Sequence, residues 1–286
     1  MFKKLGNAIK WIGEHFKGLL FLLILFIVLM PSAKTPLKKP NLQEIKLFGP
    51  IMDAEKLVKQ IEDAQKDPNI KGVLLNVNSP GGAVPPSIEI SYAVRNLKKK
   101  KPVIAYASGI MASGSYYSSI FADKIIANPG AIVGSIGVIM ESADIEELLN
   151  KIGIKPQVVK EGKYKEAGTP TRKWTPQERA ELERLTKDTY TLFVSDVAKA
   201  RHLDINASEN YANAHIFLAS RAKDVGLIDA VGTLSDAKKE LEKRSGVKKA
   251  VWKQKDKLES FMEKLTSQAM FQMQSYFYGL KAAFPY

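Results

Sequence analysis

Residues 108–117 read Ser-Gly-Ile-Met-Ala-Ser-Gly-Ser-Tyr-Tyr and follow the apolar, partly β-branched run 102–107. A strand that ends in Gly and Ser and continues as a helix lifts one side chain and the next N–H groups to the helix N-terminus. A developing negative charge is stabilised at that end of a helix. The pattern therefore predicts a strand-turn-helix unit that presents Ser113 as a nucleophile for acyl transfer.

A second glycine-rich turn, Asn-Ser-Pro-Gly-Gly at 78–82, follows another strand-like run at 72–77. Two such turns in successive strand-helix units can supply backbone donors to one carbonyl oxygen, as an oxyanion hole requires. Gly and Ser also punctuate ordinary strand-to-helix connections. Each turn taken alone is therefore equally compatible with a structural role.

Strand-like and helix-like runs alternate along most of the chain, which predicts an α/β domain. We expect strands over 44–51, 72–78, 103–108, 124–127 and 155–160. We expect helices over 54–66, 86–100, 113–122, 145–152, 175–201, 219–225 and 235–243. The glycine-rich residues 131–140 predict a turn and a strand.

Composition shifts divide the chain into four predicted parts: a membrane anchor with a short flank over 1–33, a linker over 34–43, the α/β domain over 44–246 and an amphipathic tail over 247–286. The tail is rich in Phe, Tyr and Met. A helix with that surface could lie on a membrane, pack against another subunit or fold back onto its own core.

The predicted anchor centres on residues 18–30, GLLFLLILFIVLM, and about 16 residues without charge are short of the ~20 that span a bilayer. Tilt and snorkelling by Lys17 and Lys34 can make up the difference. The pattern also fits a secretory signal, but cleavage after Ala33 would place Pro31 where a small residue is needed. We therefore expect an uncleaved anchor. Four lysines on each side leave its orientation open.

The composition excludes several kinds of site. The 286 residues are 45% hydrophobic, enough to bury a core, and they include no cysteine, so disulfides, zinc-thiolate sites and a cysteine nucleophile are excluded. Three histidines, His15, His202 and His215, do not suggest a metal site or a Ser-His-Asp triad. A histidine-free mechanism is favoured.

The net charge of +13 favours a membrane surface over nucleic acid as the partner. Basic residues flank the apolar N-terminal segment, form the run 98–101 and recur in the C-terminal third. They are not interleaved with aromatic residues, as a nucleic-acid platform would be. The run at 98–101 is also compatible with a solvated helix face.

A serine nucleophile needs a proton acceptor, and a lysine made neutral by burial can serve. Lys163 and Lys165 lie in the loop 161–170, which contains two glycines and a proline and follows the predicted strand 155–160. Spacing alone does not choose between these two lysines.

Five motifs occur in the order found in signal peptide peptidase A, and the chain resembles the short, single-repeat bacterial form of that family of membrane-bound serine peptidases. The resemblance runs from about Glu44 to Asp229. The motifs are Asn78-Ser79-Pro80-Gly81-Gly82, Met111-Ala112-Ser113-Gly114-Ser115-Tyr116-Tyr117, Asp123-Lys124-Ile125, Gly134-Ser135-Ile136-Gly137-Val138-Ile139 and Gly162-Lys163-Tyr164-Lys165.

The resemblance implies a Clp protease/crotonase-like spiral of ββα units that assembles into a bowl-like homo-oligomer. It implies Ser113 as the nucleophile and Lys165 as the general base of a Ser-Lys dyad. Gly82 and Gly114 match the oxyanion donors, and Ser135 matches a serine that orients the base. No cofactor or metal is implied.

The resemblance also implies where the protein acts. It implies a single-pass protein of the bacterial inner membrane with its peptidase domain outside the cytoplasm. The implied substrates are signal peptides left in the membrane after secretion. The expected partners are these peptides, membrane lipid and further copies of the chain, and nucleic acid is not expected.

The chain departs from the resemblance at two places. Gly114-Ser115 stands where the family usually has Gly-Gly, which makes Ser115 a competing hydroxyl, and Ala214-His215-Ile216 stands where many relatives have Gly-Arg-Val. Two other functions stay open: a non-catalytic membrane scaffold or peptide-binding module, and a crotonase-type acyl-CoA enzyme. Neither accounts as well for Ser113 and Lys165.

Overall fold

The computed structural model describes residues 11, 15–18, 20–22 and 39–253. The chain separates into two units, residues 1–39 and 40–286. The predicted membrane segment lies mostly outside the described residues, as does the predicted tail from residue 254 onward. Among the helices that the structure does describe, none combines the length and the apolar character that crossing a bilayer requires.

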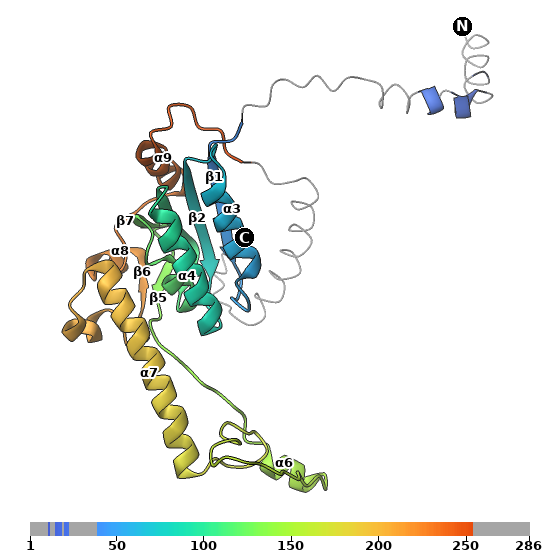
Figure 1. The fold of residues 1–286 in the computed structure, drawn as a ribbon, viewed down its shortest axis with the longest axis vertical. Coiled ribbons are helices and arrows are strands. Elements are labelled where there is room, and N and C mark those ends of the chain that lie inside the picture. The colour runs from blue at the N-terminus through green and yellow to red at the C-terminus, as the bar shows by residue number, and fades with distance from the viewer. Residues whose placement is uncertain (1–10, 12–14, 19, 23–38, 254–286) are drawn as a thin grey trace, which may run out of the picture. The chain divides into compact units, whose positions relative to one another are not determined.

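The second unit is built on a mainly parallel sheet, which confirms the predicted α/β class (Figure 1). Within the described residues its strands follow the order β1-β2-β3-β4-β7, with β5 beside β3 and β6 antiparallel to β5. The strands are β1 (Leu42–Phe48), β2 (Gly72–Ser79), β3 (Val103–Ala112), β4 (Lys124–Ala127), β5 (Ile132–Gly134), β6 (Ile216–Leu218) and β7 (Ala230–Val231).

Helices cover both faces of this sheet because alternate residues of its central strands are buried on opposite sides. Val73, Leu75 and Val77 join the larger apolar cluster, which also takes in residues of α3, α4 and α5, whereas Leu74 and Ile104 join a smaller cluster under α9. The helices of these two layers are α3 (Glu55–Lys66), α4 (Val84–Lys98), α5 (Gly114–Ser119), α8 (Ala219–Asp224) and α9 (Leu234–Ser245).

Strand β3 extends four residues beyond its predicted end because it changes neighbours along its length. Its first part pairs with β4 through Ala107, and its last three residues, Ile110–Ala112, pair with β5. At the change, the Asn78 side-chain oxygen accepts a 3.0 Å hydrogen bond from the Ile110 amide. The second half of β3 thus delivers the chain to Ser113.

Helix α7 (Pro176–Arg201) begins at a complete capping box formed by Thr175 and Glu178, as the Thr-Pro-Gln-Glu pattern predicts. Its C-terminal part is buried through Phe193, Val194 and Val197, while most of its N-terminal part is exposed. Figure 1 shows this N-terminal part extending from the sheet toward the segment that carries α6 (Glu146–Lys151). The short 3₁₀ helix η1 (Ile205–Asn210) follows α7.

The predicted strand 155–160 is wrong. These residues form no strand, and every one of them is exposed. A strand needs a neighbouring strand to satisfy its backbone groups, and this segment has none in the described part of the chain. Strands β6 and β7, which are only three and two residues long, were not predicted from the sequence.

Residues 247–253, which the sequence analysis placed in the tail, are hydrogen-bonded to the start of β1. The Asn41 amide donates to the Val251 carbonyl at 2.8 Å, and the Lys253 amide donates to the Leu42 carbonyl at 2.8 Å. Trp252 packs against the smaller apolar cluster.

Candidate active site

Ser113 occupies the turn between β3 and α5 in a strained backbone conformation, φ 53° and ψ −126°. Such a conformation costs a non-glycine residue about 1–3 kcal/mol and persists only where the surroundings enforce it. The Ser113 amide donates to the Gly134 carbonyl at 2.8 Å, and the Ser113 carbonyl accepts from the Tyr117 amide at 3.0 Å. The turn presents a half-buried serine at the N-terminus of α5, as predicted.

The two glycine-rich turns are in direct contact. A Cβ added to Gly81, whose φ is +96°, would lie 2.6 Å from the Gly114 amide nitrogen. A Cβ added to Gly114 would lie 3.3 Å from the Gly82 nitrogen. The amides of Gly82 and Gly114 therefore neighbour each other, and neither donates to a carbonyl among the described residues. Two such unpaired donors beside a serine are the components of an oxyanion hole.

Ser115 is a buried structural hydroxyl. It is fully buried, its oxygen accepts from the Ala112 amide at 2.9 Å, and its hydroxyl lies 2.6 Å from the Ser79 carbonyl. It therefore ties the first glycine turn to the second. Its side chain has no access to a substrate in this conformation.

A small, mainly apolar pocket of about 30 Å³ opens beside Ser113. Tyr117 lies one helical turn after Ser113, and its hydroxyl donates a hydrogen bond to the Asp196 carboxylate of α7. Burial and this bond raise the pKa of Tyr117, so the hydroxyl stays protonated at neutral pH. The pocket is lined by Gly82, Val84, Ser87, Ile88, Ser113, Gly114, Tyr117, Gly137, Val138, Thr189, Leu192 and Phe193.

Ser135 lies near Ser113 because the strands that precede them are paired. Ala112 of β3 is in register with Gly134 of β5. Ser135 also has a positive φ, 50°, and its amide donates to the His215 carbonyl at 2.7 Å. The structure thus brings Ser113, Gly82, Gly114 and Ser135 together, just after the carboxyl ends of β2, β3 and β5.

Lys165 is not brought to this region within the chain. It is exposed, it does not line the pocket at Ser113, and its loop belongs to the segment between α6 and α7 that Figure 1 shows away from the sheet. The neighbouring Lys163 amine lies 5.2 Å from the centre of the Tyr164 ring. Among the described residues no carboxylate pairs with Lys165.

The histidines are not placed as bases. His202 ends α7 in a left-handed conformation, and the exposed His215 contributes its carbonyl to Ser135. Neither side chain lines the pocket. Ala214, at φ +57°, adopts a conformation that glycine adopts without strain, so a glycine would suit this position.

The model of peptidase family S49 matches residues 95–248, more than half of the chain. The chain belongs to peptidase family S49. The matched residues include Ser113, Ser135 and Lys165. The glycine-rich turn at 78–82, which contains Gly82, lies before the matched region.

The S49 chain is similar to several known proteins. A Methanocaldococcus jannaschii protein named as a protease is 45% identical over 68% of this chain and 63% of its own length. An Enterococcus faecium protein named as the signal peptide peptidase SppA is 35% identical over 66% of this chain and 55% of its own. The chain thus spans between half and two thirds of these relatives. A solved ClpP1 structure from Listeria monocytogenes aligns with 68% of this chain and 93% of its own, at 16% identity and a TM-score of 0.48.

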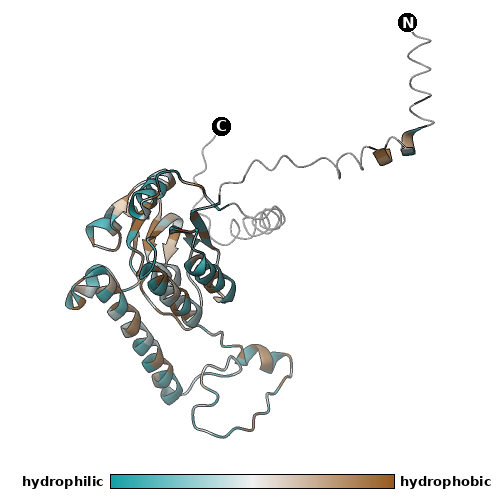
Figure 2. Ribbon diagram, turned by 45° about the horizontal axis from the view of Figure 1, so that its top comes forward, coloured by the Kyte–Doolittle hydropathy of each residue, from teal (hydrophilic) through white to brown (hydrophobic). Residues whose placement is uncertain are grey.

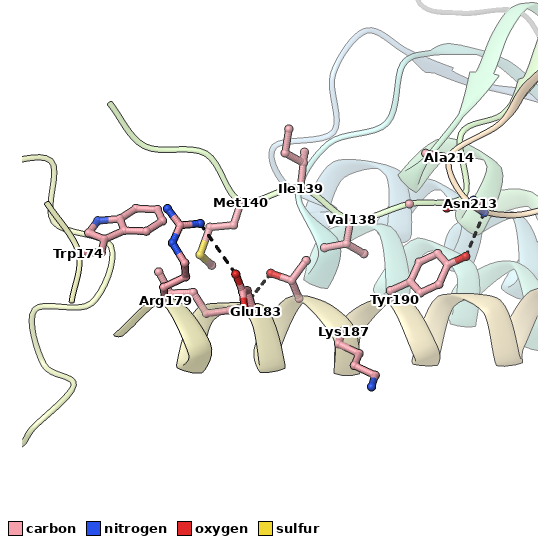
Figure 3. Close-up of a pocket in the computed structure, with 13 residues that line it drawn as sticks. Val138, Ile139, Met140, Trp174, Arg179, Glu183, Lys187, Tyr190, Asn213 and Ala214 are labelled. Atoms are coloured by element: carbon pink, nitrogen blue, oxygen red, sulfur yellow. Dashed lines mark hydrogen bonds and ion pairs between the residues drawn. The ribbon is translucent and has the colours of Figure 1, made fainter. Parts of the chain in front are cut away.

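A larger groove continues from the pocket in this S49 chain. Gly137 and Val138 line both, and the groove holds about 570 Å³. Figure 3 shows Val138 and Met140 facing helix α7, with Trp174 and Arg179 at one end and Tyr190 bonded to Asn213 at the other. The site is therefore open along one side.

The contribution of α7 to the site was not predicted from the sequence. Thr189, Leu192 and Phe193 line the pocket, and Asp196 holds Tyr117. Their spacing of three and four residues marks one face of a helix, but that pattern is the same for a face that packs on a core. Only the tertiary structure places this face opposite Ser113.

Proposed function

We propose that this chain is a serine endopeptidase in which Ser113 is the nucleophile and Lys165 the general base. The observation that carries the proposal is the strained Ser113 at the N-terminus of α5, beside a pocket with apolar walls and two adjacent amides that donate to no carbonyl in the described part of the chain. That arrangement suits attack on a carbonyl carbon whose oxygen becomes negative. The S49 relatives, which are named as proteases, support peptide hydrolysis.

The proposed reaction has two stages. The Ser113 oxygen attacks the peptide carbonyl carbon while the neutral Lys165 amine takes the hydroxyl proton, and the amides of Gly82 and Gly114 stabilise the oxyanion. The C–N bond then breaks as the lysine proton passes to the leaving amine. Water, deprotonated by the same amine, attacks the acyl-serine, and the lysine returns the proton to the Ser113 oxygen as the ester bond breaks and the acid is released.

We propose that Lys165 meets the Ser113 of a second copy of the chain. Its own loop leaves the amine in solvent, whereas the base has to be desolvated to be neutral. The segment between α6 and α7, which carries this loop, also exposes apolar side chains, among them Ile154 at 51% and Val159 at 103%. Figure 2 shows apolar stretches recurring along it. A homo-oligomer would cover these side chains and complete the site.

Signal peptides that remain in the membrane after secretion are the proposed substrates. The pocket walls are supplied largely by Val84, Ile88, Val138, Leu192 and Phe193, which suit an apolar side chain.

We further propose that the domain forms a Clp protease/crotonase-like spiral. We also propose that an uncleaved N-terminal anchor holds the chain in the inner membrane, with the domain outside the cytoplasm. The parallel sheet with its site at the β3–α5 turn supports the spiral fold.

A fluorophosphonate probe tests the nucleophile and the base together. We expect the full-length protein to be labelled at Ser113, and S113A and K165A each to lose labelling and peptide hydrolysis by at least a factor of about 10³. Activity should rise from pH 6 toward pH 9, because the base has to be neutral.

H215A is the matched control, since His215 is the histidine whose backbone lies beside Ser135. It should keep both activities. Labelling that survives in K165A but is lost in H215A would identify a different base. A protein that takes no label at all would instead be a scaffold or peptide-binding module.

A further inference from the structure

The loop that carries Lys165 has little apolar packing to hold it in place. Glu161 through Lys165 are exposed, and the loop turns at Gly162, which has a φ of +94°. The backbone bonds near Lys165 are local, such as the 3.2 Å bond from the Lys165 amide to the Gly162 carbonyl, and a bond to a distant segment occurs at the end of the loop, where the Pro170 carbonyl accepts from the Ile145 amide at 2.9 Å. A general base has to be held precisely, because a misplacement of about 1 Å can cost a hundredfold in rate. Some other interaction therefore has to fix this loop.

Arg172 links the loop to the first turn of α7. Its guanidinium donates two parallel hydrogen bonds to Glu178, at 2.9 Å and 2.8 Å. The Glu178 side chain is only 4% exposed, and it also accepts from the Thr175 amide at 2.9 Å in the capping box. This two-pronged geometry fixes the orientation of the guanidinium as well as its position. One end of the link is thus anchored to a regular helix.

The other end of the link holds Glu166, the residue next to Lys165. Arg172 donates from Nη2 to the Glu166 carboxylate at 2.9 Å, and Lys160 donates to the same oxygen at 2.7 Å. Hydrogen bonds from Lys160 and Arg172 lower the pKa of Glu166, so it is ionised at neutral pH. Arg172 therefore bridges two carboxylates, one in the helix cap and one in the loop.

We infer that Arg172 is a positioning residue that sets the place of Lys165 by clamping Glu166 to the Glu178 cap of α7. The inference rests on the proposed role of Lys165 as the base. Arg172 itself touches neither the substrate nor the reacting atoms. The clamp accounts for the meeting of four acidic and basic side chains where the exposed loop approaches the start of α7: Lys160, Glu166, Arg172 and Glu178.

Two variants break the clamp at different points. R172Q removes both links, whereas E166Q leaves the Arg172–Glu178 pair intact. For each we expect kcat to fall about ten- to hundredfold with KM nearly unchanged, because the peptide binds at the pocket by Ser113 and not at the clamp. Fluorophosphonate labelling of Ser113 should slow by the same factor. The double variant E166Q/R172Q should be no worse than R172Q alone, since both act through one contact.

R184Q is the matched control, because Arg184 forms an exposed ion pair with Glu181 on the same helix. It should behave as the wild type. The full-length variants are compared at equal oligomer size and with unchanged circular dichroism, and if R172Q does not fold, E166Q alone decides.

The outcomes separate this inference from the proposed function. Wild-type kcat and labelling in E166Q and R172Q, with K165A inactive, would overturn the clamp and leave the Ser-Lys dyad standing. A rise in KM with kcat unchanged would also overturn it, because the clamp would then serve substrate binding. Full activity in K165A would overturn the proposed base, and the clamp with it.

Discussion

Single residues decide the geometry around Ser113. The serine adopts a conformation that L-residues rarely occupy, and Gly81 approaches the next turn so closely that a methyl group would meet the Gly114 amide. Both features serve to bring two backbone donors next to one hydroxyl. Ser115, which looked like a competing nucleophile, is the residue that joins the two turns.

Ser115→Ala should therefore weaken the fold and spare the nucleophile. The substitution leaves the buried Ala112 amide without its acceptor and the Ser79 carbonyl without its donor, which costs about 1–3 kcal/mol. Thermal unfolding should shift downward while Ser113 still takes a fluorophosphonate label in the folded protein. Loss of the label at unchanged stability would mean that Ser115 is itself the nucleophile.

At the scale of elements, α7 has two halves with different surroundings. Its C-terminal half packs on the core and lines the pocket, and its N-terminal half carries the charged capping box. The bonds from Arg172 lower the pKa of Glu178 to about 2, below its ordinary value of 4.5. Because the folded-state pKa is the lower one, this bond stabilises the protein fully above about pH 4.5 and less as the pH falls toward 2.

Glu178→Gln should consequently lower the melting temperature most above about pH 5, and the difference from the wild type should shrink as the pH falls toward 2. Scanning calorimetry at a series of pH values measures this difference. Glu183→Gln is the control, since Glu183 lies in an exposed pair 3.9 Å from Arg179. A deficit in Glu178→Gln that is constant with pH would show that the carboxylate charge is not involved.

Two segments show where sequence patterns fail to predict secondary structure. The run 155–160 has the composition of a strand, yet pairing, and not composition, makes a strand. The converse holds for Ile110–Ala112, which follow a Ser-Gly pair typical of a turn and form a strand because β5 is available beside them.

At the scale of the whole molecule, the proposed dyad requires two chains, and this makes a mixing experiment decisive. S113A and K165A, coexpressed in equal amounts, should regain about a quarter of the wild-type activity if each site combines residues from two copies. Neither variant alone should be active. No recovery from confirmed mixed oligomers would show that Ser113 and Lys165 act within one chain.

The exposed apolar side chains between α6 and α7 should be needed for assembly. Val159→Asp places a charge on a fully exposed valine, which a single chain tolerates and a buried interface does not. Sedimentation should show a smaller species, and peptide hydrolysis should fall with it. An unchanged oligomer would remove this segment from the proposed interface.

The sequence by itself determined the α/β rhythm, the capping box of α7 and the serine at the β3–α5 turn, because these depend on local preferences and on periodic burial. It also predicted the two glycine turns as partners. Only the tertiary structure decided which strands pair, that α7 walls the pocket and that Ser115 is buried, since these depend on contacts between distant segments. The separation of Lys165 from Ser113 belongs to the same class, because its loop takes its place from contacts with distant segments, such as the bond from the Ile145 amide to the Pro170 carbonyl, which no local pattern encodes.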